Sequence, residues 1–404
     1  MSKPTFTTIT KLIPLVSLLF LIQCGDSGLQ QARDLIGNVQ SEYAPDSRVA
    51  IFDIQPSRER GKLILRGETN IPEVISALEQ QFGETNLNPA LEITVLPAAD
   101  LANSQYGVVN ISVTNLRAHP DRGAELVTQA IMGTPVRRYK SNDYWDLIQT
   151  PDGYLGWVDR GTVVWMNQSE FDSWRAARRC LFTAPFGLVF NSEDGNHEII
   201  SDLVVGSILE TEGIRGQNWI VRLPDGQQGM LPGNQAVDFT AWIQAPASGS
   251  GDVTGRARTF LGFPYLWGGT SSKGFDCSGF TKTVYFMNGY LLPRDASQQV
   301  TIGQLVTREV DTDRMQPGDL LFFGRKATAD QPEKATHVGI YLGDTEFIHS
   351  SGKVKINSFD STRANYNEYR YNHFLQARRI LNDPAIPRIR KKDWYWLPPK
   401  RPAS

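Results

Sequence analysis

The stretch "YLWGGTSSKGFDCSGF", residues 265–280, sets one of only three cysteines in the chain between small and acidic neighbours. The apolar residues that follow have helical spacing: Phe280, Val284 and Met287. Asp276 suits the N-cap of this helix, so Cys277 is predicted at a helix N-terminus. The helix dipole at that position favours a thiolate, which predicts a lowered pKa for the thiol.

Four roles are open to such a cysteine: a packed core residue, half of a disulfide, a metal ligand or a nucleophile. The other cysteines are Cys24 and Cys180, and nothing in the sequence brings Cys180 close, although one pair stays open. Neither Cys180 nor Cys277 has a second cysteine or histidine at ligand spacing. "HEIIS", residues 197–201, lacks the second histidine of a metalloprotease motif, so we predict no metal site.

A nucleophilic cysteine needs a base, and "THVGIYLGDTEFIHSSG", residues 336–352, supplies two histidines. His337 opens one apolar strand and His349 closes the next, each six residues from Gly343. In a hairpin that turns near Gly343 the two histidines come close to being cross-strand neighbours. We therefore predict that Cys277 is a nucleophile served by this pair, in which one histidine acts as the base and the other can orient it.

Length and composition indicate several domains. A chain of 404 residues exceeds one ordinary core, because domains hold roughly 100–200 residues. Hydrophobic residues make up 40% of the chain and charged residues 21%, as in soluble globular proteins. The formal charge of −2 gives no reason to expect nucleic-acid binding.

The N-terminus is typical of an exported protein. Lys3 and Lys11 precede the apolar run "LIPLVSLLFLI", residues 12–22, which is too short to span a bilayer comfortably but suits a signal peptide. "LIQC" resembles a bacterial lipoprotein box in which Cys24 is lipidated, although Gln23 replaces the usual small residue. We expect residues 1–24 to be this signal and the protein to be periplasmic or at the cell surface, membrane-anchored through Cys24, with plain secretion as the alternative.

A repeat organises the middle of the chain. "NDYWDLIQTPDGYLGWVDRGTVVW", residues 142–165, is echoed by "GQNWIVRLPDGQQGMLPGNQAV", residues 216–237, and each copy turns at Pro-Asp-Gly. Short strands with such turns predict two small β-barrels. These resemble bacterial Src-homology-3-like domains, which gate substrates or bind the wall in peptidoglycan enzymes.

The predicted organisation is α+β and multidomain. Its segments are a signal peptide with lipobox (1–24), a linker or short helix (25–47), a small α/β module weakly resembling BON domains (48–97), two barrels (98–172 and 173–245), a C-terminal domain (246–385) and a basic tail (386–404). A Gly/Ser-rich linker over residues 245–255 leads into the C-terminal domain.

Residues 246–385 resemble the NlpC-type cell-wall peptidases. The resemblance rests on the opening stretch, on "MQPGDLLFF" (residues 315–323), on "THVGIYLG" and on "FIHSSG", in this order. It implies a papain-like fold that needs no cofactor, and hydrolysis of the γ-D-glutamyl to diamino-acid bond in peptidoglycan stem peptides, the diamino acid being diaminopimelate or lysine. By position, the resemblance implies that Cys277 is the nucleophile, His337 the base and His349 the residue that orients the base.

The resemblance also suggests residues that contact substrate. They are Tyr265, Asp276, Ser278, Arg294, Asp295 and Ser297, with Glu125 and Tyr154 from the first barrel. Barrels of this kind close one end of the groove and select a free N-terminal L-Ala, as in cell-wall recycling. Asp276 and Asp295 are the expected partners of that ammonium. The rival interpretations are a wall-remodelling endopeptidase, an amidase or acyltransferase, and a non-catalytic peptidoglycan-binding lipoprotein.

Overall fold

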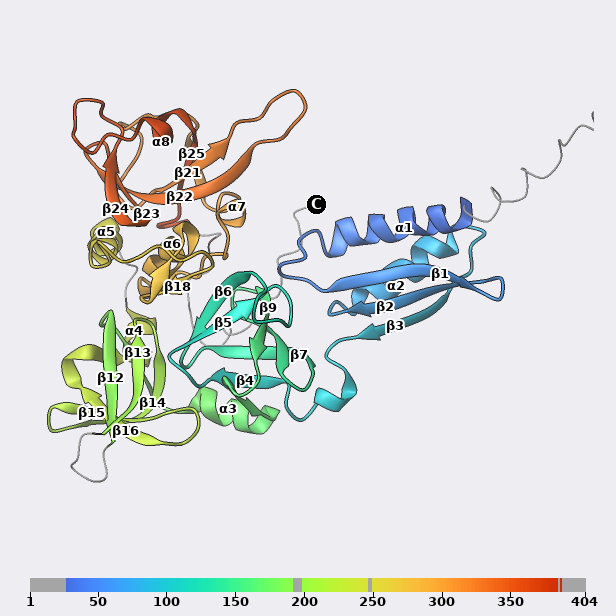
Figure 1. Cartoon of the computed structure of the whole chain (residues 1–404), viewed down its shortest axis with the longest axis horizontal. Coiled ribbons are helices and arrows are strands. Elements are labelled where there is room, and N and C mark those ends of the chain that lie inside the picture. The colour runs from blue at the N-terminus through green and yellow to red at the C-terminus, as the bar shows by residue number, and fades with distance from the viewer. Residues whose placement is uncertain (1–26, 192–197, 246–248, 384–385, 387–404) are drawn as a thin grey trace, which may run out of the picture. The chain divides into compact units, whose positions relative to one another are not determined.

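The protein is represented by a computed structural model, which describes residues 27–191, 198–245, 249–383 and 386. These residues divide into two compact units (Figure 1). The first unit holds residues 27–45 and 51–95, and the second holds residues 46–50 and the described residues from 96 onward. The predicted signal peptide, Cys24 and the basic tail beyond Ile386 lie outside the described residues.

The first unit is a small α/β module. Its elements are α1 (Ser27–Tyr43), β1 (Phe52–Glu59), β2 (Lys62–Thr69), α2 (Glu73–Gly83) and β3 (Ala90–Val95). β1 pairs with β2 antiparallel, and β2 pairs with β3 in parallel, which requires the crossover through α2. Val74, Leu78 and Phe82 are buried along α2, as their spacing predicts.

Two segments near the N-terminus are resolved differently from the sequence expectation. For residues 25–47 the sequence predicts either a linker or a short helix. The structure has the 17-residue helix α1, which buries Ala32, Ile36 and Val39. The stretch "RVAIFDI", residues 48–54, has an apolar pattern that predicts a strand, but β1 starts only at Phe52. Residues 46–50 instead form a turn that belongs to the second unit.

The first barrel of the second unit is a seven-stranded sheet in the order β10-β4-β7-β8-β9-β5-β6. Its elements are η1 (Ala99–Leu101), β4 (Tyr106–Val109), β5 (Val113–Arg117), β6 (Leu126–Ile131), β7 (Pro135–Ser141), β8 (Trp145–Gln149), β9 (Leu155–Asp159), β10 (Val163–Met166) and α3 (Gln168–Ala176). Gly153 of the predicted Pro-Asp-Gly turn has a φ of +86°, which favours glycine. The turn therefore joins β8 to β9 for the reason the sequence suggests.

The second barrel has the strand order β13-β12-β16-β15-β14-β11-β17. Its elements are β11 (Arg179–Phe182), β12 (Phe186–Asn191), β13 (Ile199–Val204), β14 (Ile208–Arg215), β15 (Asn218–Arg222), β16 (Gln228–Pro232), η2 (Gly233–Gln235), β17 (Ala236–Asp238) and α4 (Phe239–Gln244). Gly226 repeats the left-handed turn residue, with a φ of +92°. The sequence repeat is thus a repeat of one hairpin.

The C-terminal domain packs helices against a six-stranded sheet in the order β20-β25-β21-β22-β23-β24. Its elements are α5 (Ser250–Arg258), β18 (Thr270–Ser271), β19 (Gly274–Phe275), α6 (Cys277–Met287), α7 (Ala296–Gln299), β20 (Gln304–Thr307), β21 (Leu320–Arg325), β22 (Lys334–Gly343), β23 (Glu346–Ser351), β24 (Lys353–Ser358), α8 (Glu368–Asn372) and β25 (Phe374–Arg379). The expected linker over residues 245–255 is shorter than predicted, because α5 begins at Ser250 and buries Val253 and Ala257.

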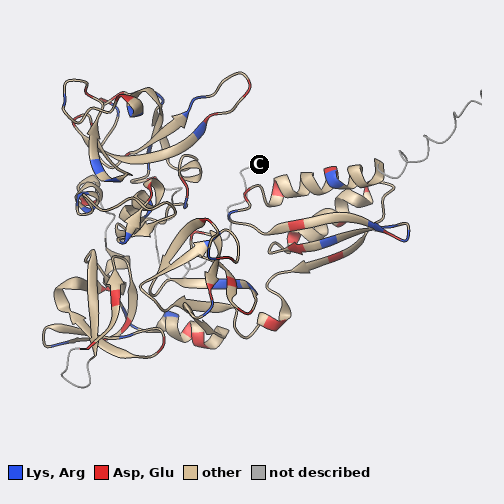
Figure 2. Cartoon of the chain, viewed as in Figure 1, with Lys and Arg blue, Asp and Glu red and all other residues tan. Residues whose placement is uncertain are grey.

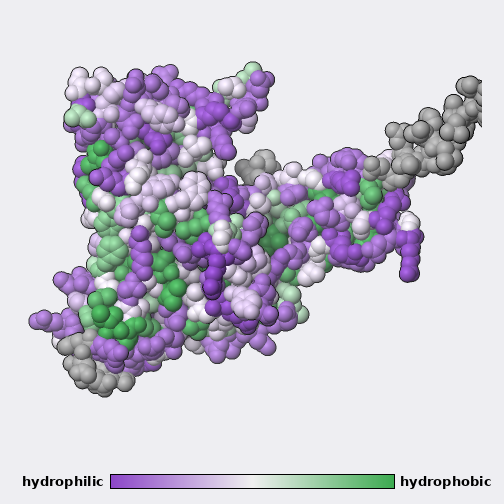
Figure 3. Space-filling model, in the orientation of Figure 1, coloured by the Kyte–Doolittle hydropathy of each residue, from purple (hydrophilic) through white to green (hydrophobic). Residues whose placement is uncertain are grey.

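The surface carries mixed charge and exposed apolar residues. Basic and acidic residues are interspersed over the second unit (Figure 2). Apolar surface gathers over the second barrel (Figure 3), where Phe186 and Ile199 are 53% and 55% exposed on β12 and β13. Among the helices of the described residues, none is long and apolar enough to cross a membrane.

Candidate active site

Cys277 is the first residue of α6, and Asp276 is the N-cap, as predicted. The Asp276 side chain accepts a hydrogen bond from the Gly279 backbone N–H at 2.7 Å. Any residue other than glycine at position 279 would clash with the backbone, because a Cβ there would lie 2.0 Å from the Gly269 carbonyl oxygen. The helix start therefore packs directly on the Gly268-Gly269 turn, and this contact holds Cys277 in a buried position.

The expected lowering of the thiol pKa is wrong. Burial, followed by the charge of Asp276, raises the pKa of Cys277 to about 11. Backbone N–H groups of Val338 and Ser278 and the charge of Arg294 act in the opposite direction without offsetting the burial. The sequence shows the helix position but not the loss of solvent around the sulfur, and the second effect is the larger one. At neutral pH Cys277 is therefore protonated at rest.

His337 and His349 meet on neighbouring strands, as the hairpin predicts. β22 and β23 pair with Ile340 opposite Ile348, so the histidines are diagonal neighbours on one face. His337 Nε2 lies 2.7 Å from His349 Nδ1, and the ring planes are perpendicular. Gly339 makes room for this contact, since a Cβ there would meet His349 Cβ at 3.1 Å.

A third residue extends the hydrogen bond between the two histidines. Asn357 on β24 places its Oδ1 2.8 Å from His349 Nε2. Its own Nδ2 donates to the Asn365 carbonyl oxygen at 3.0 Å, and Asn367 donates to Oδ1 at 3.1 Å, so the orientation of the amide is determined. His349 must therefore carry its proton on Nε2, and its Nδ1 is an acceptor.

This arrangement fixes the tautomer of His337. His337 Nε2–H donates to His349 Nδ1, which leaves Nδ1 of His337 unprotonated in the neutral ring. Burial is the main cause that lowers the pKa of His337 well below its usual value, and the nearby charge of His349 adds to it. Burial likewise lowers the pKa of His349, to about 3. The structure therefore combines a buried Cys277 thiol with a neutral His337 imidazole that keeps one unprotonated nitrogen.

Arg294 organises the polar residues behind Cys277. Its side chain is 1% exposed and forms a short ion pair with Asp276 Oδ2. It also donates to Ser278 Oγ at 3.0 Å and, from Nε, to Thr128 Oγ1 of the first barrel at 3.0 Å. Asp276 thus caps its helix and is paired with a buried arginine at the same time.

Asp295 is also paired, with an arginine from far upstream. Arg48 Nη1 lies 2.7 Å from Asp295 Oδ2 and donates to Ser297 Oγ at 2.9 Å. Tyr154 of the first barrel donates its hydroxyl to the same Asp295 oxygen at 3.0 Å. The structure brings together the predicted residues Tyr154, Asp295 and Ser297, but around a cation that the sequence did not reveal.

Glu125 and Tyr265 lie on the more open side. Glu125 is exposed and accepts a hydrogen bond from the Trp267 indole N–H at 2.8 Å. Burial raises the pKa of Tyr265 to about 12, and the charges of Cys277 and Asp276 contribute, which places this phenol near the nucleophile. Tyr265 therefore lies close to Cys277, and Glu125 contacts Trp267 of the peptidase domain.

Arg370, on α8, was not singled out from the sequence. It is half-buried, and its guanidinium lies 5.6 Å from the Phe323 ring centroid, beside His337. Within the described residues its side chain has no carboxylate partner, although Cys277 and Tyr265 are close enough to influence its pKa, which burial lowers. A cation in this setting suits a carboxylate of the substrate.

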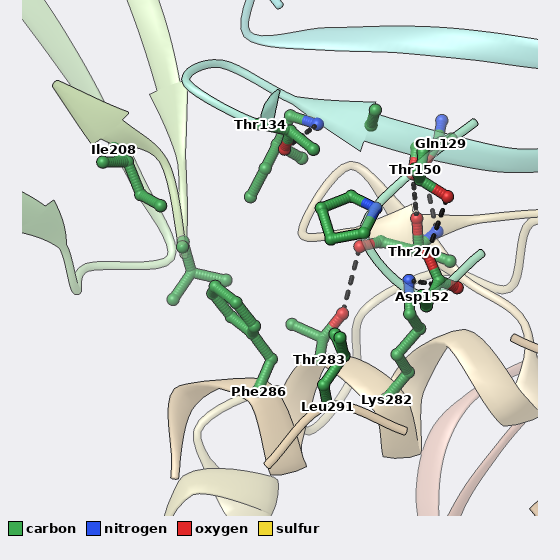
Figure 4. A pocket seen from close by; sticks show the side chains of 15 residues that line it. Gln129, Thr134, Thr150, Asp152, Ile208, Thr270, Lys282, Thr283, Phe286 and Leu291 are labelled. Carbon is green, nitrogen blue, oxygen red and sulfur yellow. Dashed lines mark hydrogen bonds and ion pairs between the residues drawn. The ribbon is translucent and has the colours of Figure 1, made fainter. Parts of the chain in front are cut away.

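A separate pocket lies where the two barrels meet α6 (Figure 4). Gln129 and Thr134 of the first barrel, Ile208 of the second and Phe286 of α6 line it. Lys282 reaches across to Asp152 at 3.0 Å, and both side chains are largely buried. The lining does not include the nucleophile or the histidines, so we interpret this pocket as a junction between domains.

Cys180 is free, buried in the second barrel, and distinct from this chemistry. Burial raises its pKa to about 12, so it is a core residue.

Comparisons with known proteins identify relatives of this chain. Residues 262–379 match the NlpC/P60 family, and residues 116–161 match the bacterial dipeptidyl-peptidase Sh3 domain. The chain is 32% identical to a γ-D-glutamyl-L-lysine dipeptidyl-peptidase of Bacillus cereus, over 56% of this chain and 67% of that protein. It is 30% identical to dipeptidyl-peptidase 6 of Lysinibacillus sphaericus, over 65% and 94%. A solved NlpC/P60 structure from Bacillus cereus aligns with a TM-score of 0.59 at 25% identity, over 68% of this chain and 99% of that one.

Proposed function

This chain belongs to the NlpC/P60 family of cysteine hydrolases, and we propose that it cleaves the γ-D-glutamyl to diamino-acid bond of peptidoglycan stem peptides with Cys277 as nucleophile. One observation carries the proposal: the hydrogen-bonded relay His337–His349–Asn357 leaves Nδ1 of His337 unprotonated, as a base requires. The next residue, Val338, brings this strand close to Cys277, because its backbone N–H lowers the pKa of the Cys277 thiol. The names of the relatives in Bacillus cereus and Lysinibacillus sphaericus supply the choice of bond and of the dipeptide product.

The first half of the reaction acylates the enzyme. His337 Nδ1 takes the Cys277 proton while the sulfur attacks the γ-carbonyl carbon of D-glutamate. The backbone N–H of Cys277, at the start of α6, is among the helix N–H groups without an intrahelical acceptor and stabilises the oxyanion. The imidazolium then gives its proton to the leaving amine, the C–N bond breaks, and a thioester at Cys277 remains.

The second half releases the dipeptide. His337 Nδ1 removes a proton from water, the hydroxide attacks the thioester carbonyl, and the sulfur leaves and recovers its proton from His337. His349 keeps its hydrogen bond to His337 Nε2–H throughout, which stabilises each imidazolium that forms. Cys277 returns to the thiol state in which it rests.

The charge of the substrate gives Arg370 a role. A γ-linked D-glutamate carries a free α-carboxylate close to the scissile bond. Arg370 is half-buried, near Cys277 and Tyr265, and lacks a carboxylate partner within the described residues. We assign this carboxylate to Arg370, because a charge-assisted hydrogen bond in a partly buried site discriminates strongly against a neutral group.

The first barrel supports action on free peptides. Tyr154 and Glu125 belong to the stretch that matches the dipeptidyl-peptidase Sh3 domain and reach Asp295 and Trp267 of the peptidase domain. We expect the barrel to limit this end of the substrate site to a short amino-terminal segment, so that soluble stem peptides from wall recycling fit better than intact wall. The function also implies export, which accords with the signal peptide and lipidation of Cys24 expected from the sequence.

Product analysis tests the proposal. Purified protein is incubated with L-Ala-γ-D-Glu-L-Lys, its diaminopimelate counterpart or intact sacculi, and products are identified by mass spectrometry. We expect L-Ala-D-Glu from the free peptides, and none with Cys277→Ala. Activity on sacculi alone would indicate a wall-remodelling endopeptidase, and no cleavage of any substrate would favour a binding protein.

A further inference from the structure

The leaving group of the proposed reaction lies beside the two histidines. His337 gives its proton to the departing amine, so the diamino acid must lie on the histidine side of Cys277. Lysine and diaminopimelate both carry an ammonium at the end of the side chain, and diaminopimelate carries a carboxylate there as well. A cation placed for this carboxylate favours diaminopimelate over lysine. The charged groups around the histidines therefore bear on the choice of substrate.

Lys355 on β24 is a cross-strand neighbour of His349. The strand register places the two residues directly opposite each other, and opposite residues of an antiparallel pair share one face of the sheet. Asn357, two residues further along β24, lies on this face too and contacts His349 Nε2 at 2.8 Å. Burial is the first cause that lowers the pKa values of His337 and His349, and the charges of Arg370 and Lys355 lower them further. Lys355 is therefore a cation close to both histidines.

The Lys355 ammonium has no partner of its own. Its side chain is half-buried, and within the described residues it forms no ion pair or hydrogen bond. The carboxylates of these strands gather instead at the turn that joins β22 to β23 and just beyond the end of β24. Arg363 pairs there with Asp344, Glu346 and Asp360. Negative charge is thus compensated at the turn, and the positive charge of Lys355 beside the histidines is left uncompensated.

Two unpaired cations match two carboxylates of a diaminopimelate peptide. Arg370 is assigned above to the α-carboxylate of D-glutamate, next to the scissile bond, because Cys277 and Tyr265 lie close to it. Lys355 carries its charge on a flexible four-carbon chain, which suits a carboxylate at the far end of the diaminopimelate side chain. Glu368, the first residue of α8, is exposed and pairs with neither cation in the described residues. Any attraction from it acts on the ammonium that both diamino acids carry, so it does not discriminate between them.

We propose that Lys355 is a specificity-determining residue that binds the side-chain carboxylate of diaminopimelate, so that the enzyme prefers diaminopimelate peptides to lysine peptides. The inference rests on the function proposed above. An ammonium without a partner keeps its three N–H donors for a ligand, and no internal ion pair has to break when the ligand binds. Solvent and salt screen a half-buried pair less than a fully exposed one. The lysine peptide is still cleaved, because it lacks only this contact.

Tripeptides that differ only in the diamino acid test this inference. The value of kcat/KM is measured for L-Ala-γ-D-Glu followed by meso-diaminopimelate, by diaminopimelate whose side-chain carboxylate is amidated, or by L-lysine. Wild-type protein is expected to prefer the first peptide about tenfold over each of the other two. The amide keeps the size of diaminopimelate and removes only the charge, so this comparison separates charge from shape. The carboxylate at the end of the backbone is common to all these peptides and cancels.

Variants of Lys355 isolate the cause. In Lys355→Gln the preference for diaminopimelate over lysine is expected to fall to about twofold or less, because the cation is gone. Its loss also acts on the histidines, but that effect is common to all the peptides and cancels in the ratio. Lys355→Arg keeps a cation and is expected to keep most of the preference. Lys62→Gln is the matched control with the wild-type ratio, since Lys62 is an exposed strand lysine in the other compact unit. Thermal melts verify that each variant is folded.

The outcomes separate the two proposals. A wild-type enzyme that cleaves the diaminopimelate peptide and its amide equally well overturns the role of Lys355 and leaves the peptidase function intact. A folded Lys355→Gln variant that keeps the wild-type preference does the same. Failure of the wild-type protein to cleave any of the tripeptides overturns the proposed function, and the role of Lys355 with it.

Discussion

Replacing Asn357 with alanine tests whether the histidine relay works through its tautomers. His349 is fully buried, and Asn357 Oδ1 is the acceptor that holds its proton on Nε2. Without it, His349 either keeps an unsatisfied buried N–H, which costs about 1–3 kcal/mol, or moves the proton to Nδ1. In the second case the His349 Nδ1–H points at the His337 Nε2–H, so the His337 proton must move to Nδ1. His337 then has no unprotonated nitrogen available as the base.

The cost of the unsatisfied His349 N–H also sets the expected loss of activity in Asn357→Ala. If about 1–3 kcal/mol separates the productive tautomer from the alternative, kcat falls about 5-fold to 150-fold while KM changes little. The assay is release of L-Ala-D-Glu from L-Ala-γ-D-Glu-L-Lys across a range of concentrations. Asn357→Asp keeps an acceptor oxygen and is expected to restore most of kcat. Because its negative charge favours the imidazolium, it should also move the acidic limb of the pH profile upward.

A control separates the relay from simple loss of stability. Asn70 accepts a hydrogen bond from the Ile51 backbone N–H at 2.8 Å in the other compact unit, so Asn70→Ala also removes a local hydrogen bond but leaves the relay intact. We expect it to lower the melting temperature without lowering kcat. The tautomer argument is refuted if Asn357→Ala retains kcat within about twofold of wild type, or if Asn357→Asp is as impaired as the alanine variant.

Three other predictions follow from the same contacts. Arg370→Met is expected to raise KM for the peptide about tenfold or more while alkylation of Cys277 by iodoacetamide stays within about twofold; an unchanged KM would remove Arg370 from substrate binding. Because burial lowers the pKa values of His337 and His349, the unfolded chain binds protons below about pH 6.5 that the folded chain does not. Stability is therefore complete above that pH and falls as the pH drops, by up to about 1.4 kcal/mol per pH unit for each histidine, and this dependence should flatten in His337→Gln/His349→Gln melts. Gln129→Ala strips the acceptor from the Thr270 N–H and the Ser271 hydroxyl at the buried contact with the first barrel, so unfolding should cost about 1–3 kcal/mol less in denaturant titrations, and an unchanged midpoint would contradict this.

The parts of the site that sequence reveals are those set by local geometry. Asp276 and Cys277 follow from helix capping, and the contact of His337 with His349 follows from strand alternation around Gly343. The turn residues bear this out, since Gly343 has a φ of +97°. In each case a short stretch of chain determines both the element and the direction of the side chain.

The parts that sequence does not reveal depend on distant contacts or on burial. Arg48 and Asp295 are 247 positions apart, and the pattern around Arg48 resembles a strand, so no local signal indicates the turn that joins them. Asn357 is one polar residue in an alternating strand, and only the pairing of β23 with β24 places it near His349. The raised pKa of Cys277 likewise comes from the domain packed around α6, because helix position alone favours the opposite shift.

Trapping the acyl-enzyme tests the central claim most directly. Protein mixed with excess L-Ala-γ-D-Glu-L-Lys is quenched in acid after milliseconds to seconds and examined by intact-mass and peptide mass spectrometry. We predict a transient L-Ala-γ-D-glutamyl thioester on the peptide that contains Cys277, absent in Cys277→Ala, which accumulates in step with released lysine. Release of lysine by the Cys277→Ala variant would contradict the account. So would an acyl adduct on any residue other than Cys277.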